Sequence, residues 1–78
     1  MLDVEILLPE VRKSVTVQVL TGGTKLRAVL LGQTGEQLQV FGLPGEINIL
    51  SLDGFSAGMY ALRIESGAEV IVKQIIIP

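Results

Sequence analysis

Short runs in which apolar and polar residues alternate make up most of the chain. In the first run, Leu2 and Val4 alternate with Asp3 and Glu5, and the valines of residues 15–19 alternate with polar residues in the same way. Residues two apart lie on one face of a β-strand, whereas an amphipathic helix needs apolar residues three and four apart. The alternation therefore predicts half-buried strands and no helix.

Turn signals separate these runs from one another. The further runs carry apolar residues at Leu26, Ala28 and Leu30, at Leu38 and Val40, at Ile47 and Ile49, and in residues 58–65 and 69–77. Two of the turns between them are assigned to Gly35 and Gly67. Short strands separated by turn signals about every 8–12 residues are typical of an antiparallel sandwich or barrel. We therefore expect one all-β domain of about seven strands over residues 1–78.

The register of the last two runs depends on the loop that joins them. A three-residue loop, Ser66-Gly67-Ala68, with Gly67 left-handed, sets Tyr60 opposite Gln74 and Leu62 opposite Val72. The core face then also holds Ile64, Val70 and Ile76, and the opposite face holds Arg63 beside Ile71, Lys73, Ile75 and Ile77. A two-residue loop is the alternative. We expect the longer loop because it keeps Glu69 and every other charge of the hairpin on one side.

Charge and residue inventory exclude several classes of function. The six Lys and Arg residues are scattered among eight acidic residues, for a net charge of −2, so no basic stripe is available to nucleic acid. The chain has no His and no Cys, which removes the usual general base, the thiol nucleophile and the common soft metal ligands. We therefore expect a protein that is not an enzyme, with no catalytic residue, metal or cofactor.

The segment from Leu50 onward carries the most specific motif. It reads Leu50-Ser-Leu-Asp-Gly-Phe-Ser-Ala-Gly-Met-Tyr-Ala-Leu-Arg-Ile64, and the chain closes with Lys73-Gln-Ile-Ile-Ile77 before Pro78. With a weaker match upstream from about residue 25, it resembles the C-terminal sorting domain of proteins exported by the type IX secretion system of Bacteroidetes. That family's pattern reads roughly apolar-Ser-x-Leu-x-x-Gly-x-Tyr-x-apolar-Arg/Lys-Ile, a turn, and Lys-Lys-Ile-apolar-apolar.

The match to this pattern is direct at some positions and absent at others. The residues that match directly are Gly58, Tyr60, Leu62, Arg63, Ile64, Lys73, Ile75, Ile76 and Ile77. The weaker upstream match is to the family's strand-turn-strand segment, usually written with Tyr-Asp-x-x-Gly-Arg, where Leu31 and Gly32 replace Tyr-Asp and Glu36 replaces Arg. In the tail, Gln74 replaces the second Lys, and Pro78 ends a segment that often ends in Lys.

The resemblance implies a small immunoglobulin-like antiparallel β-sandwich that forms the C-terminal domain of a longer exported protein. Such a domain catalyses nothing and needs no cofactor. It directs its parent through the periplasm and the outer membrane to the cell surface, and its partners are the outer-membrane translocon with its shuttle and sortase components. The nine matching residues are then the expected recognition residues. Each also has a purely structural alternative, in which it fills the core or shapes a turn.

Two other interpretations stay open. An accessory adhesion or carbohydrate-binding sandwich would use the rings of Phe41, Phe55 or Tyr60, because sugar faces stack on aromatic rings. An apolar edge strand could also pair with a second copy and form a homodimer.

Overall fold

Seven β-strands account for most of the part of the chain that the structure describes. The structure is a computed structural model, and it describes residues 2–7, 14–21, 25–67 and 69–77. The strands are β1 (Asp3–Leu7), β2 (Ser14–Thr21), β3 (Leu26–Leu31), β4 (Gln37–Leu43), β5 (Ile47–Ser51), β6 (Gly58–Ser66) and β7 (Glu69–Ile77). These residues form no helix, and the predicted all-β class is confirmed.

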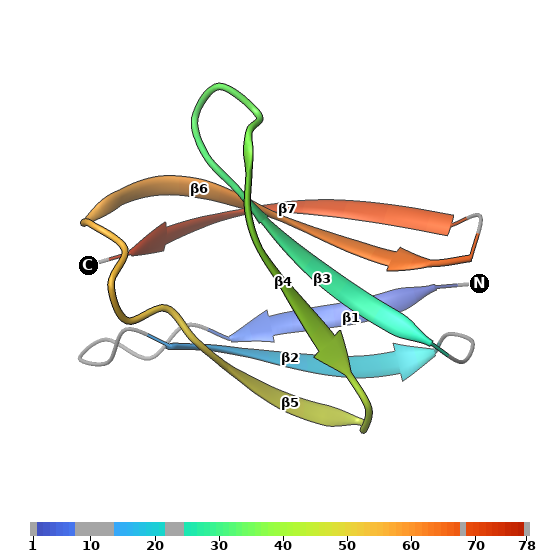
Figure 1. Cartoon of the computed structure of the whole chain (residues 1–78). Helices are drawn as coiled ribbons and strands as arrows, with labels where there is room; N and C mark the ends of the chain where they lie inside the picture. Colours follow the sequence, from blue (N-terminus) through green and yellow to red (C-terminus); the bar gives the residue numbers. More distant parts are fainter. Residues whose placement is uncertain (1, 8–13, 22–24, 68, 78) are drawn as a thin grey trace.

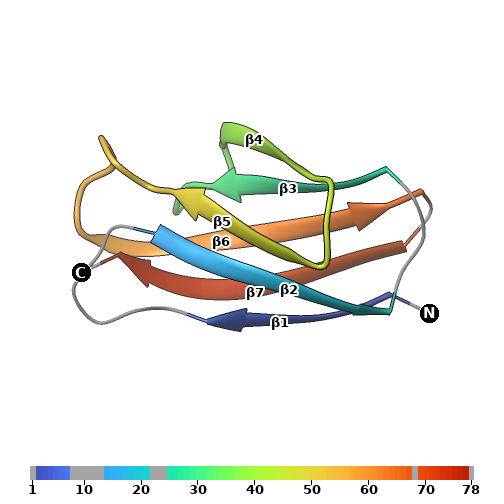
Figure 2. The ribbon, with the colours of Figure 1, turned by 90° about the horizontal axis from the view of Figure 1, so that it is seen from below.

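The strands form two antiparallel sheets packed face to face (Figures 1 and 2). One sheet has the order β1-β2-β5 and the other the order β4-β3-β6-β7. The chain changes sheet between β2 and β3, between β4 and β5, and again between β5 and β6. These crossovers are the Greek-key connections of an immunoglobulin-like sandwich. The strand orders place β1 and β5 at the edges of the first sheet and β4 and β7 at the edges of the second.

The core lies between the sheets and is filled by alternate residues of the strands. β2 contributes Val15 and Val17, and β3 contributes Leu26, Ala28 and Leu30, all on the sides that the alternation predicted. Burying a large aliphatic side chain contributes roughly 1.5–3 kcal/mol, which offsets the conformational entropy lost by ordering the strand. The remaining buried residues of the core are Leu2, Val4, Leu43, Leu50, Leu52, Leu62, Ile64, Ile75 and Ile77.

In β5 the alternation is present, but the sequence interpretation of its buried side is wrong. Asn48 points into the core, whereas Ile47 and Ile49 are exposed. The Asn48 side-chain amide donates to the backbone oxygens of Val17 and Gly45, and its oxygen accepts from the Gly45 nitrogen. A buried amide is tolerated when its donors and acceptor are paired in this way. These bonds also tie β5 to β2 and to the loop that precedes it.

The same reversal occurs in β4. Leu38 and Val40 are exposed, while Leu43 is buried and Phe41 packs against the core. A register shift opposite Leu30 and Leu31 of β3 interrupts the pairing of β4 near Leu38. The strand therefore presents its two regularly spaced aliphatic residues to the outside of the sandwich.

The expected three-residue loop between β6 and β7 is wrong. Ser66 pairs with Glu69, which leaves two residues in the loop, and Gly67 adopts a left-handed φ of 58°. This one-residue change moves every β7 side chain to the other face. Ile75 and Ile77 are consequently buried, and Val70, Val72 and Ile76 are exposed.

Two physical reasons favour the observed register. At inward positions of β7, isoleucines replace the valines of the expected register, and each added methylene is worth about 0.8 kcal/mol when buried. The predicted penalty for Glu69 does not arise, because its carboxylate accepts a hydrogen bond from the backbone nitrogen of Leu2 beside β1. The carboxylate of Glu69 therefore lies at the open edge of the sandwich, where the backbone of Leu2 pairs with it.

The register predicts opposite responses at two adjacent positions. Ile75→Val removes a methylene from a fully buried side chain, so the free energy of unfolding should fall by about 0.5–1.5 kcal/mol. Ile76→Val alters an exposed side chain, so its effect should stay within about 0.5 kcal/mol. Urea denaturation of both variants measures the difference. The reverse order of effects would support the three-residue loop instead.

Candidate functional site

The β6–β7 hairpin holds all nine residues that match the sorting-domain motif. Gly58 pairs with Ile77, Tyr60 with Ile75, and Leu62 with Lys73, so the two halves of the motif lie side by side. The hairpin lies in the sheet that β3 and β4 complete (Figure 1). The structure thus brings these residues together on one element but divides them between its two faces.

Four of the nine residues belong to the core. Leu62 and Ile64 of β6 and Ile75 and Ile77 of β7 are fully buried. They pack against both sheets and are inaccessible to another molecule while the domain is folded. Lys73 follows the same alternation toward the inner face, but it is exposed because β7 is the edge strand.

Gly58 and Tyr60 organise the entry into β6. Gly58 has a φ of 151°, a conformation that residues with a side chain rarely adopt. The Tyr60 hydroxyl donates to the backbone oxygen of Ser56 over 2.8 Å, and its ring meets that of Phe55 edge to face at a centroid distance of 6.3 Å. Tyr60 therefore fastens the loop between β5 and β6 to the hairpin.

The outward side of the hairpin forms the surface that we call the outer face: Met59, Arg63, Glu65, Val70, Val72 and Ile76. Of the nine motif residues, Arg63 and Ile76 belong to it. Val70 and Val72 are surface residues that the sequence did not reveal, because the expected register placed them in the core. The alternative two-residue loop would have placed both valines on the surface.

Two arginines surround one carboxylate at the centre of this face. Arg27 Nε donates to Glu65 Oε1 over 2.5 Å, and Arg63 Nε lies 2.8 Å from Glu65 Oε2. The second contact is an ion pair, and the Nε atom of Arg63 is buried. The cluster therefore carries a surplus of one positive charge.

The same cluster perturbs the titration of Glu65. The hydrogen bond from Arg27 is the main cause that holds the pKa of Glu65 below its ordinary value of 4.5. Desolvation of the carboxylate opposes this effect, and the charges of Arg27 and Arg63 and a hydrogen bond from Arg63 reinforce the lowering of the pKa. Glu65 consequently stays ionised as the pH falls into a range where an unpaired glutamate binds a proton.

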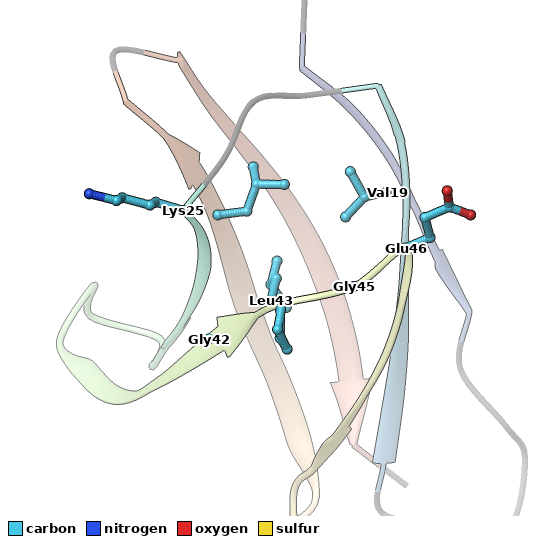
Figure 3. Close-up of a pocket in the computed structure, with 8 residues that line it drawn as sticks. Val19, Lys25, Gly42, Leu43, Gly45 and Glu46 are labelled. Atoms are coloured by element: carbon cyan, nitrogen blue, oxygen red, sulfur yellow. The ribbon is translucent and has the colours of Figure 1, made fainter.

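A cavity of about 640 Å³ lies at one end of the sandwich (Figure 3). It is lined by Val19, Lys25, Leu26, Gly42, Leu43, Pro44, Gly45 and Glu46. Figure 3 shows the charged ends of Lys25 and Glu46 directed away from the space between Val19 and Leu43. The walls that remain are mainly apolar and offer no side chain that would orient a polar ligand.

A second hollow, of about 560 Å³, lies beside Tyr60. It is lined by Gln33, Thr34, Glu36, Leu38, Gly54, Phe55, Ser56, Ala57, Gly58 and Tyr60. The β3–β4 turn supplies the polar wall, and Gly35 in that turn has a φ of 85°. Phe41, the third candidate aromatic residue, does not line it. Two of the three rings predicted for a sugar site therefore share one hollow.

Neither a metal site nor a spanning helix is found in the described ranges. Their acidic residues form no group of three or more that could hold a metal ion. No helix in the same ranges could cross a membrane.

No protein-family model matches the sequence, and no curated protein matches it either.

The arginine–glutamate cluster predicts a specific dependence of stability on pH. Because the pKa of Glu65 is lowered in the folded state, the ionised carboxylate stabilises the fold above the unfolded pKa. That contribution is lost as the pH falls through the folded pKa. Urea denaturation between pH 7 and pH 3 should therefore show a shallower acid loss for Glu65→Gln than for the unmodified chain.

The matched variant for this experiment is Arg27→Gln. It keeps the carboxylate but removes the main cause of the lowered pKa, so it should flatten the acid loss in the same direction. An acid loss unchanged in both variants would show that the cluster does not contribute to the pH dependence.

Proposed function

We propose that this chain is a non-catalytic sorting domain that directs its parent protein through the type IX secretion system. The observation that carries the proposal is the convergence of the motif on one hairpin. Its two segments, residues 58–64 and 73–77, are separate in sequence but pair directly in β6 and β7. The motif then specifies a folded hairpin with a defined outward surface, which a translocon can recognise.

The buried motif residues have a supporting role in this proposal. Leu62, Ile64, Ile75 and Ile77 hold the hairpin in the sandwich, and Gly58 and Tyr60 fix the loop that leads into it. Arg63, Lys73 and Ile76 remain accessible to a partner. The proposed partners are the outer-membrane translocon and its shuttle and sortase components. The proposed route leads through the periplasm to the cell surface, with the domain at the carboxyl end of a longer protein.

Transfer of the domain to a reporter tests the proposal. Residues 1–78 fused to the carboxyl end of a periplasmic reporter should move the reporter to the surface or medium of a bacterium that has the type IX system. In a strain without the translocon, the same fusion should accumulate in the periplasm. The reporter without the domain is the control. Retention of the fusion in the periplasm of the competent strain would contradict the proposal.

Deleting residues 75–78 from the fusion should abolish export and leave the reporter in the periplasm. The structure adds a reason for this expectation, since the deletion removes Ile75 and Ile77 from the core. The domain would lose its fold together with any recognition residue. Protease sensitivity of the truncated domain measures the loss of fold, and normal surface display would overturn the sorting proposal.

We propose an accessory adhesion or carbohydrate-binding module as the second candidate function. The observation that favours it is the hollow that Phe55 and Tyr60 line together with Gln33, Thr34 and Glu36. Aromatic rings combined with amide, hydroxyl and carboxylate groups in one hollow are chemistry that suits a sugar.

Titration with a glycan panel tests the second candidate. Binding should be reduced by Phe55→Ala, with a loss of about 1–3 kcal/mol if the ring is an anchor. Phe41→Leu, outside the hollow, should leave it unchanged. Amide chemical shifts that do not respond to any glycan at millimolar concentration would eliminate this candidate.

A further inference from the structure

We infer that the outer face docks a partner protein whose contact surface is apolar and carries a carboxylate. The inference rests on the proposed sorting function, because the partner would belong to the export machinery. It concerns a surface that the motif residues define only in part, through Arg63 and Ile76. Its other exposed apolar residues are Met59, Val70 and Val72.

The exposed apolar residues of the surface form two groups, Val70 with Val72 and Met59 with Ile76, with Gln74 and Ala61 between them. Met59 pairs with Ile76, Arg63 with Val72, and Glu65 with Val70, and cross-strand neighbours of this kind lie about 4.5–5.5 Å apart. Val70, Val72 and Ile76 are 53%, 56% and 59% exposed. Isolated exposed aliphatic residues are ordinary, whereas four of them on one side of a hairpin mark a candidate interaction surface.

The surface also extends across the sheet. Val29 of β3 pairs with Arg63 on one side and with Val40 of β4 on the other. Val29 is buried on this outward side, and Val40 is exposed. A row from Val40 to Val72 therefore crosses all four strands. This breadth suits a protein surface better than a single side chain or a small ligand.

A shallow hollow at one end of the face offers a place for an anchoring side chain. It has a volume of about 260 Å³ and is lined by Gly32, Gln33, Met59, Tyr60, Ala61 and Gln74. Binding energy at protein interfaces concentrates where one side chain fills such a depression. The hollow borders Met59, so an anchor placed there would lie beside the apolar residues of the outer face.

The charge at the centre of the face selects the chemistry of the partner. Arg27 and Arg63 share Glu65, so the cluster keeps one positive charge that no carboxylate of the cluster balances. Covering this cluster with a purely apolar surface would desolvate the surplus positive charge without pairing it, which is costly. A carboxylate on the partner would neutralise the surplus. An apolar surface with one acidic group is therefore the complementary one.

The same charge argues against a second copy of this chain as the occupant. Two outer faces stacked on each other would each bring a surplus positive charge into a shared apolar interface. Like charges placed together across an interface cost several kcal/mol. A heterologous partner avoids this repulsion, and the carboxylate gives it a favourable orientation.

The opposite sheet supplies a matched control surface. On its outer side, Ile49 of β5 is 74% exposed, more than any residue of the outer face. It lies opposite Thr16 of β2, and Glu5 of β1 lies on the same side beside Gln18. Ile49 therefore reports what a charge on an exposed aliphatic position does outside the proposed surface.

The first arm of the test measures the surface itself, without the export machinery. The probes are dodecanoate and dodecyltrimethylammonium below their micelle concentrations, followed by methyl and arginine Nε NMR shifts of the folded domain. Dodecanoate should shift Val70, Val72, Ile76 and the Arg63 Nε–H, and the cationic probe should shift them less. Equal shifts from both probes, or the largest shifts at Ile47 and Ile49, would overturn the inference.

The second arm measures export of the reporter fusion with single charges introduced on each surface. Val72→Glu should reduce export about tenfold, as expected for loss of a central contact, and Ile49→Glu should stay within about twofold of the unmodified domain. Both variants need unfolding midpoints near that of the parent, so that export reports docking and not folding. Normal export of a folded Val72→Glu fusion would overturn the inference.

The two arms separate this inference from the proposed function. Failure of the unmodified fusion to be exported refutes the sorting proposal, and the probe arm then decides alone on the surface chemistry. Export that is insensitive to Val72→Glu refutes the surface and leaves the sorting proposal standing. Arg63→Gln adds a further readout, because it should make export efficiency or dodecanoate binding weaker and less dependent on salt.

Discussion

The register of the β6–β7 hairpin determines which side chains the domain keeps in its core and which it presents to other molecules. Ser66 pairs with Glu69, and all pairs from there to Gly58 and Ile77 follow without interruption. Because side chains alternate between faces, this single pairing places Ile75 in the core and Ile76 outside. The core, the outer face and the accessibility of the motif residues all depend on it.

Alternation alone predicted the strands better than it predicted their buried sides. In β1 and β2 the outward face is mostly polar, so the buried side was evident from residues such as Val4 and Val17. In β3 the charged Arg27 marks the outward face, although Val29 on that face is also buried. In β5 the polar residue is the buried one, because Asn48 finds backbone partners that no sequence pattern reveals. In β7 both faces are apolar, and the loop length decides between them.

The candidate site was also predicted only in part from the sequence. The two segments that carry the resemblance, residues 58–64 and 73–77, pair in one hairpin, as their positions on either side of one turn predicted. The motif did not identify the exposed valines of β7, since their exposure depends on a loop one residue shorter than expected. Nor did it predict the cluster of Arg27, Arg63 and Glu65, which requires β3 to lie beside β6 in the folded sheet.

Lys73 has a consequence for how the domain can associate with other chains. It lies at an inward position of the edge strand β7, opposite Leu62, yet it remains exposed. A foreign strand that extended the sheet at β7 would enclose this ammonium group between two sandwiches, which disfavours growth at that edge. The proposed docking through the outer face would leave Lys73 in water. Lys73 therefore disfavours open-ended polymerisation through the β7 edge. It does not interfere with reversible binding of a partner on the outer face.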